Sequence, residues 1–232
     1  MTEQLPLALR LRDSSSFGNF LAVENAEVVR RLEAAARGEV RGEQIFLWAP
    51  TACGKSHLLE ACCRRAAECS RTPAYVPLAQ RDRFAPDLVD GLEAVDIVCL
   101  DDLTSVAGDR RWESAIFRLY DRVRDAGGVL VAAGATSPAR AEFAMPELAS
   151  RIARGLVYRL VDLDDAHKGE AVRLRAAARG MSLGDDVVRF ILRRHSRDLN
   201  ALFALLDRID RASLAEQRRI TVPLIKKLLD ET

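Results

Sequence analysis

The sequence lacks several features that would assign a function class at once. No apolar run approaches the roughly 18 residues of a membrane-spanning helix, so no contact with a membrane is expected. Basic and acidic residues nearly cancel, 35 against 34, which argues against a strongly electrostatic grip on nucleic acid. The five cysteines are odd in number and form no C-x-x-C pair, so neither a disulfide framework nor a zinc site is predicted. A reducing, cytoplasmic compartment fits this cysteine usage.

Lysine is also scarce, because the 35 basic residues include only four lysines, at positions 55, 168, 226 and 227. A lysine in a motif is therefore stronger evidence than an arginine. What the chain has instead is apolar residues, 49% of 232. That content excludes disorder and is enough for one domain with a small appendage.

The hydrophobic pattern predicts an α/β fold followed by a helical region. Short, continuous apolar runs predict buried strands at 44–48, 74–78, 95–100, 129–133 and 156–161. Helical spacing predicts intervening helices at 25–36, 55–69, 86–92, 112–125 and 146–154. This alternation favours a mostly parallel sheet. Only helices are expected afterwards, at 168–179, 185–194, 197–212 and 222–230.

The strand at 44–48 runs directly into a loop of the phosphate-binding type, which opens a helix. The loop ends in Gly54, Lys55 and Ser56, although Ala49 replaces the first glycine of the G-x-x-x-x-G-K-[S/T] motif. Such a loop faces an anion with backbone N–H groups, and its lysine and hydroxyl reach the phosphates and Mg²⁺. The alternative is a strand–turn–helix that carries Gly-Lys-Ser by chance.

Two carboxylates, Asp101 and Asp102, follow the apolar run VDIVCL. Ligands of open α/β sheets lie at the C-terminal edge of the strands, where these side chains are expected. One carboxylate can hold Mg²⁺ and the other can orient a water. An Asp-Asp pair alone is more often a turn, but together with the loop it predicts a Walker B motif.

Two arginines and one N-terminal segment are further candidates. Arg151 belongs to a short predicted helix, where an i, i+4 ion pair with Glu147 is the competing interpretation. Arg197 is expected at the start of a helix, where a cation opposes the helix dipole unless Asp198 compensates it. Alternating leucines in the segment Gln4–Leu9 predict either a docking strand or an edge strand of the domain itself.

Together these motifs resemble the AAA+ nucleotide-binding module, and more narrowly the central ATPase region of the bacterial initiator DnaA. The matching segments, within residues 17–232, are the Phe17–Phe20 entry, GKSHLL, LDDL, SRIARGL and SRDLNALFALLDRID. The DNA-binding domain of the initiator is not expected, because the sequence ends after the lid. A module of this kind led by a Gln-Leu-x-Leu-x-Leu arm is similar to the Hda family of DnaA-related replication regulators.

The resemblance implies an AAA+ P-loop domain with a parallel sheet (17–163), a small all-α lid (164–232) and an arm (1–16). It implies that ADP or ATP and Mg²⁺ bind, that the arm docks on the polymerase sliding clamp, and that the protein promotes hydrolysis of ATP on DnaA. DNA is then contacted only through the clamp, the protein is cytoplasmic and associated with the nucleoid through it, and homo-oligomer formation stays open.

The resemblance also assigns roles to individual residues. The catalytic residues are the Walker B pair Asp101 and Asp102 and a trans-acting arginine finger, Arg151, with Arg154 as a second candidate. Ser56 and Asp101 belong to the Mg²⁺ shell. The clamp-binding residues are Gln4, Leu5, Leu7 and Leu9. The nucleotide-binding residues are Ala52, Cys53, Gly54, Lys55, Ser56, His57 and Arg197.

Two departures from the family pattern imply a weak intrinsic ATPase at most. Ala49 replaces a loop glycine, and Ala135 and Thr136 stand where a polar sensor-1 residue is expected. Other classes remain open: a DnaA-like or helicase-loader ATPase that acts directly on DNA, an autonomous P-loop kinase, and an adaptor with an inactive nucleotide site.

Overall fold

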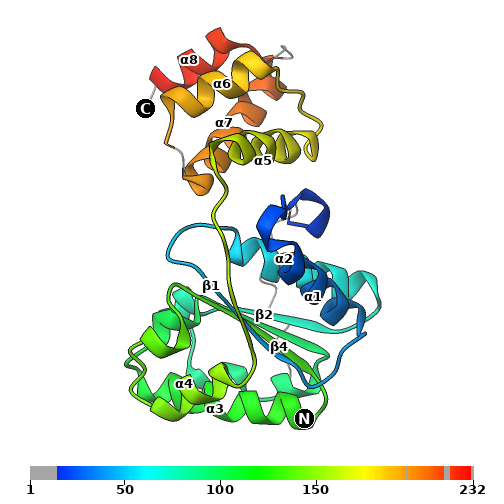
Figure 1. The fold of residues 1–232 in the computed structure, drawn as a ribbon, viewed down its shortest axis with the longest axis vertical. Coiled ribbons are helices and arrows are strands. Elements are labelled where there is room, and N and C mark those ends of the chain that lie inside the picture. Colours follow the sequence, from blue (N-terminus) through cyan, green and yellow to red (C-terminus); the bar gives the residue numbers. More distant parts are fainter. Residues whose placement is uncertain (1–14, 197, 217–219, 231–232) are drawn as a thin grey trace.

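The computed structural model describes residues 15–196, 198–216 and 220–230. It has a larger α/β part and, beyond a narrow connection, a helical part, which Figure 1 shows one above the other. The predicted fold class, a parallel α/β domain followed by a helical lid, is confirmed. No helix in the described ranges is long and apolar enough to cross a membrane.

The sheet has five parallel strands in the order β2-β3-β4-β1-β5. They are β1 Gln44–Trp48, β2 Pro73–Pro77, β3 Ile97–Asp101, β4 Val129–Gly134 and β5 Leu156–Arg159. The central strands are buried on both faces, which explains their continuous apolar runs. Because all strands are parallel, the C-terminal ends of β1, β3 and β4 lie at the same edge of the sheet.

Two layers of helices cover the two faces of the sheet (Figure 1). Ile45 and Leu47 of β1 pack into the core under α1 (Ala26–Arg37) and α2 (Lys55–Glu68). Phe46, which points to the opposite face, packs into the core with α3 (Arg110–Asp125) and α4 (Pro146–Ala153). The helix that contains the phosphate-loop lysine and the helix that contains Arg151 therefore lie on opposite faces of the sheet.

Two helices of the α/β part differ from the prediction for local reasons. The single helix expected at 86–92 is wrong: the structure has two 3₁₀ turns, Pro86–Val89 and Leu92–Ala94, separated by Gly91 with φ +87°. Helix α3 begins two residues early because the Asp109 carboxylate accepts hydrogen bonds from the backbone N–H groups of Arg111 and Trp112. Further 3₁₀ turns are Phe17–Asn19, Val23–Asn25, Leu78–Arg83, Leu103–Val106 and Pro138–Arg140.

The lid is a bundle with its own apolar core, which includes Val172, Leu202, Leu206 and Ile225. Its helices are α5 Asp165–Ala177, α6 Asp185–Arg194, α7 Leu199–Glu216 and α8 Val222–Asp230.

Two lid helices do not start where the sequence pattern placed them. Helix α5 starts three residues early, because the Asp164 side chain accepts from the N–H of His167. The predicted start of α7 at position 197 is wrong: the helix begins at Leu199, and the Asp198 carboxylate accepts from the N–H of Ala201.

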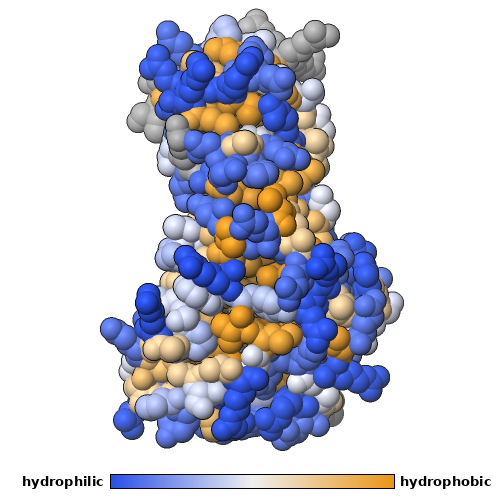
Figure 2. Space-filling model, viewed as in Figure 1, coloured by the Kyte–Doolittle hydropathy of each residue, from blue (hydrophilic) through white to orange (hydrophobic). Residues whose placement is uncertain are grey.

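The chain between the two parts is held by Asn25. Its side-chain amide donates to the carbonyl of Val161 and accepts from the N–H of the same residue, both at 2.9 Å. This pair of bonds imitates a strand ladder and fixes the connection where it leaves the sheet. Apolar residues reach the surface along this narrow region (Figure 2). Val161, which Asn25 holds, is exposed.

Candidate functional site

The predicted phosphate loop lies between β1 and α2, so its strand–loop–helix context is as expected. Gly54 precedes the helix with φ +84°, and a Cβ atom there would lie 2.8 Å from Cε2 of Phe20. Both the left-handed backbone and the aromatic ring therefore require glycine at this position. The Phe20 ring of the Phe17–Phe20 segment therefore packs directly against the loop at Gly54.

The Lys55 side chain folds back along the loop. Its Nζ donates to the carbonyl oxygens of Ala49 (2.8 Å) and Thr51 (3.0 Å). Burial lowers the pKa of Lys55, against the opposing charges of neighbouring groups that include Asp101 and Asp102. A phosphate is a stronger acceptor than these neutral carbonyls, so the position suits an anionic ligand.

An open cleft of about 780 Å³ lies between the predicted phosphate loop and the lid helices α5 and α7. Five of the predicted nucleotide-binding residues line it together: Ala52, Gly54, Lys55, Ser56 and His57. Cys53 faces an adjoining pocket instead, and its Sγ lies 2.9 Å from Oγ1 of Thr51. Arg197, the predicted lid arginine, lies outside the described residues.

The predicted Walker B carboxylates stand at the C-terminal end of β3, and a tyrosine that the sequence analysis missed holds the first. Oδ2 of Asp101 accepts from the Tyr75 hydroxyl at 2.7 Å, and Oδ1 accepts from the N–H of Asp102 at 3.1 Å. Burial, followed by the charge of Asp101, raises the pKa of Tyr75 well above its usual range. The parallel register of β2 and β3 pairs Tyr75 with Cys99, two residues before Asp101, so this neighbour follows from the fold and has no local signal in the sequence.

Asp102 has a left-handed backbone, φ +55°. Burial raises the pKa of its carboxyl and the charge of Asp101 raises it further, whereas Lys55 and a hydrogen bond with Thr104 lower it. A carboxylate pair with an excess of negative charge favours a bound cation. Each Asp101 oxygen keeps a lone pair, and Mg²⁺ needs only one or two protein carboxylates besides phosphate and water, so this donor set fits Mg²⁺.

The Thr104 hydroxyl lies beside Ala135, one of the two residues at the predicted sensor-1 place. Its Oγ1 accepts from the N–H of Ala135 at 3.0 Å, at the end of β4. The hydroxyl therefore connects the Walker B side with the end of the neighbouring strand. Thr104 lies in the turn that follows β3, 31 residues before Ala135 in the sequence. The residues at the end of β4 therefore give no indication of it.

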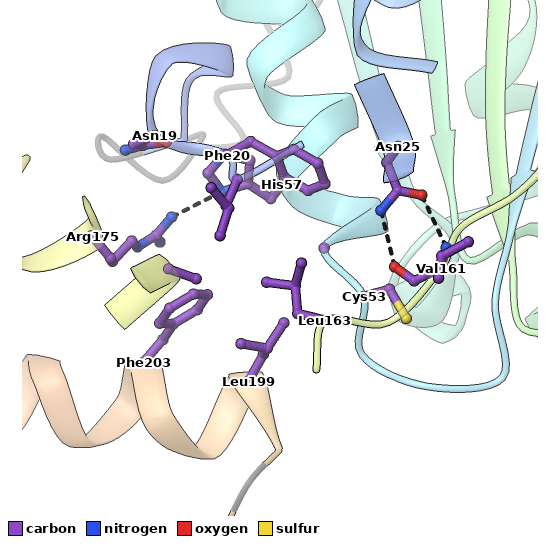
Figure 3. Close-up of a pocket in the computed structure, with 13 residues that line it drawn as sticks. Asn19, Phe20, Asn25, Cys53, His57, Val161, Leu163, Arg175, Leu199 and Phe203 are labelled. Atoms are coloured by element: carbon purple, nitrogen blue, oxygen red, sulfur yellow. Dashed lines mark hydrogen bonds between the residues drawn. The ribbon is translucent and has the colours of Figure 1, made fainter. Parts of the chain in front are cut away.

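A mostly apolar pocket adjoins the cleft (Figure 3). Its walls come from the entry segment (Phe20), the interdomain connection (Leu163), the phosphate loop (Gly54) and the lid (Leu199 and Phe203). Aromatic and aliphatic walls of this kind suit a planar base. The entry segment and the segment that contains Phe203 were both predicted as matches to the family, and neither Phe20 nor Phe203 was predicted to line the site.

Arg151 does not line this cleft or pocket. Its Nη2 donates to Oδ2 of Asp121 at 3.0 Å, and its guanidinium lies 5.2 Å from the ring centre of Phe117. The alternative prediction of an ion pair with Glu147 is wrong, because Asp121 of α3 is the carboxylate that this arginine meets.

Arg151 and Arg154 line a separate surface groove of about 630 Å³, which also includes Phe117 and Ser150. The groove is on the α3–α4 side of the sheet, away from α2. Gln4, Leu5, Leu7 and Leu9, the predicted clamp-binding residues, lie outside the described residues.

Comparisons with known proteins agree with this architecture. A family model described as the Hda lid domain matches residues 165–229. Domain III of the replication initiation protein DnaA from Thermotoga maritima superposes with a TM-score of 0.79 at 19% identity, covering 95% of this chain and 98% of that one. AMPPCP-bound DnaA from Aquifex aeolicus gives 0.68 at 18% identity, over 86% of this chain and 66% of the other.

The lid helices match the Hda lid domain, and the chain as a whole has the fold of DnaA domain III. The fold is shared more widely, since the Holliday junction branch migration motor RuvB from Thermotoga maritima gives a TM-score of 0.63 at 16% identity, over 89% of this chain and 68% of that one. The lid match is the more specific of these similarities, and it covers the helix whose Phe203 lines the cleft.

Proposed function

We propose that this AAA+ protein binds ADP or ATP with Mg²⁺ between its phosphate loop and its lid. The apolar pocket suits the base, and the adjoining cleft brings Lys55 and Ser56 to the phosphates. In this proposal Asp101, which accepts from Tyr75, would belong to the Mg²⁺ shell, and Asp102 would orient a water. The nucleotide in the related Aquifex aeolicus DnaA structure, AMPPCP, supports an adenine nucleotide.

We propose further that the protein is a regulator of replication initiation that promotes hydrolysis of ATP bound to DnaA. The observation that carries this proposal is the position of Arg151, because the sheet separates it from the protein's own phosphate loop while a groove exposes it to a neighbour. A guanidinium inserted into another subunit's site stabilises the charge that develops during phosphoryl transfer. The match to an Hda lid domain supports the same conclusion.

The proposed location of this activity is the polymerase sliding clamp. Gln4, Leu5, Leu7 and Leu9 form a segment whose leucines share one face when extended, so they suit a common apolar pocket. Ser15, near the end of the arm, is buried and donates to the Glu60 carboxylate of α2 at 2.6 Å. In this proposal DNA is reached through the clamp.

A second candidate is an ATPase that acts on DNA itself, as a DnaA-like initiator or helicase loader. The observation that favours it is the similarity to a DnaA structure bound to AMPPCP and single-stranded DNA, with a TM-score of 0.68 at 17% identity. Steep loss of single-stranded DNA affinity with rising salt would support this candidate.

A DnaA ATPase assay distinguishes the two functions. Hydrolysis of ATP on DnaA should rise when this protein and DNA-loaded clamp are both present, and should stay at its basal rate when either is left out. Stimulation that is independent of the clamp, or none at all, would contradict the regulatory proposal.

A further inference from the structure

Arg175 is a buried arginine at the contact between the lid and the phosphate-loop helix. It belongs to α5, is 5% exposed, and lines both the apolar pocket and the larger cleft. Its guanidinium lies 5.0 Å from the ring centre of Phe203, a lid residue of α7. In Figure 3 the side chain points from the lid toward the α2 side of the pocket.

His57 connects this arginine to the phosphate loop. Its Nδ1 lies 2.8 Å from Nη1 of Arg175, and its Nε2 lies 2.8 Å from the carbonyl oxygen of Ser16. A carbonyl can only accept and a guanidinium can only donate. His57 must therefore be neutral with its proton on Nε2, so that Nδ1 accepts from Arg175. Since His57 lies two residues after Lys55, this bond fixes the arginine beside the loop.

The positive charge of the side chains that line the cleft indicates which kind of ligand Arg175 contacts. Three cationic side chains, Lys55, Arg175 and Arg179, line it, and they come from both the loop and the lid. The one carboxylate among the described residues of this lining, Asp207, is paired with Arg179. A cleft lined by such a surplus of positive charge attracts an anionic ligand.

We propose that Arg175 is a lid residue that binds the phosphate groups of the nucleotide, and that His57 positions it for this task. The place fits, because Gly54, His57 and Arg175 belong to the walls of both cavities, where the base side of a nucleotide meets its phosphate side. The proposal rests on the nucleotide binding proposed above, and it adds a lid contact made from α5 in addition to the one predicted for Arg197.

Calorimetric titration of the full chain with ADP and with adenosine tests the role of Arg175. Arg175→Ala should weaken ADP binding by about tenfold or more, the usual effect of removing a hydrogen bond to a charged group. Adenosine affinity should change by less than about twofold, because the walls of the base pocket remain. Arg173→Ala is the matched control: it removes an arginine of the same helix that pairs with Asp185 outside the cleft, and it should bind both ligands as the wild type does.

A double-mutant cycle tests the positioning role of His57. His57→Ala should weaken ADP binding in the wild-type background and should have little further effect in Arg175→Ala, because the two residues act through one contact. Independent, additive losses would overturn the positioning role.

Arg175→Lys is a second variant that controls for a loss of folding, since lysine keeps the positive charge and most of the aliphatic side chain. It should bind ADP with an affinity between those of the wild type and Arg175→Ala. Equal losses of ADP and adenosine affinity in both Arg175 variants would show that Arg175 is a packing residue and overturn the proposal, as would unchanged ADP affinity. Failure of the wild-type chain to bind ADP would instead refute the proposed function.

Discussion

Replacing Arg151 with alanine tests whether this residue acts in catalysis or only stabilises the fold. In the folded chain Arg151 is 17% exposed and makes two contacts, the ion pair with Asp121 and the approach to Phe117. A partly exposed ion pair and a cation–π contact together contribute about 1–2 kcal/mol to the free energy of unfolding. The variant should therefore stay folded, with a melting temperature lower by only a few degrees.

The effect on DnaA should be far larger. Arginine fingers raise phosphoryl-transfer rates by about 10³–10⁵-fold, so clamp-dependent hydrolysis of DnaA-bound ATP should fall to its basal rate with Arg151→Ala. The assay is a single-turnover measurement of ATP hydrolysis on DnaA, with clamp on DNA and saturating variant protein. Binding of ADP by the variant itself should be unchanged, because Arg151 does not line the cleft.

Arg124→Ala is the matched control for this experiment. Arg124 pairs with the same carboxylate, Asp121, at 3.1 Å, but it does not line the Arg151 groove. Its removal should leave stimulation of DnaA intact. Full stimulation by Arg151→Ala, or equal losses in both variants, would refute the assignment of Arg151 as the finger.

Three other predictions test the nucleotide site and the arm. Lys55→Ala should weaken ADP binding at least about tenfold and remove the nucleotide-dependent rise in melting temperature; unchanged stabilisation by ADP would argue against the loop assignment. Joint replacement of Gln4 and Leu5 by alanine should abolish clamp binding in surface plasmon resonance and leave ADP affinity intact; survival of both would make the arm structural. Asp102→Asn should raise the free energy of unfolding at pH 7, because the raised pKa of this carboxyl opposes ionisation in the folded state. This gain should vanish in denaturant titrations below about pH 4, where the unfolded carboxyl is also protonated, and a gain that persists there would reject the electrostatic cause.

The sheet can be predicted from the sequence because a strand that is buried on both faces has apolar residues at consecutive positions. Ile45 and Leu47 pack on one side and Phe46 on the other, so a run with no polar interruption marks a central parallel strand. Helix starts are predicted less well, since they depend on caps such as Asp109 and Asp164, whose side chains can equally lie in turns. Gly91 shows the same limit, because one left-handed residue divides an expected helix into two turns.

The candidate site was predictable where its residues are contiguous and unpredictable where they meet across the fold. The loop and the Asp101–Asp102 pair each lie in a single segment, so spacing reveals them. Tyr75 reaches Asp101 from 26 residues away, and Arg175 reaches His57 from 118 residues away. In a chain with so many arginines, nothing local distinguishes Arg175 from its neighbours, and only the packing of the lid identifies it.

The arrangement of the sheet connects these observations to the proposed regulation. A parallel β-sheet with one helical layer on each face gives a chain two chemically different sides, and here the phosphate loop is on one side and Arg151 on the other (Figure 1). A single molecule can therefore hold its own nucleotide between the loop and lid while it presents a guanidinium to the nucleotide of a neighbour. Because the lid contacts α2 through His57 and Arg175, nucleotide binding should order the lid with little direct effect on α4. Nucleotide occupancy and finger activity are then separable by mutation, which is the behaviour expected of a regulator that acts on another protein's ATP.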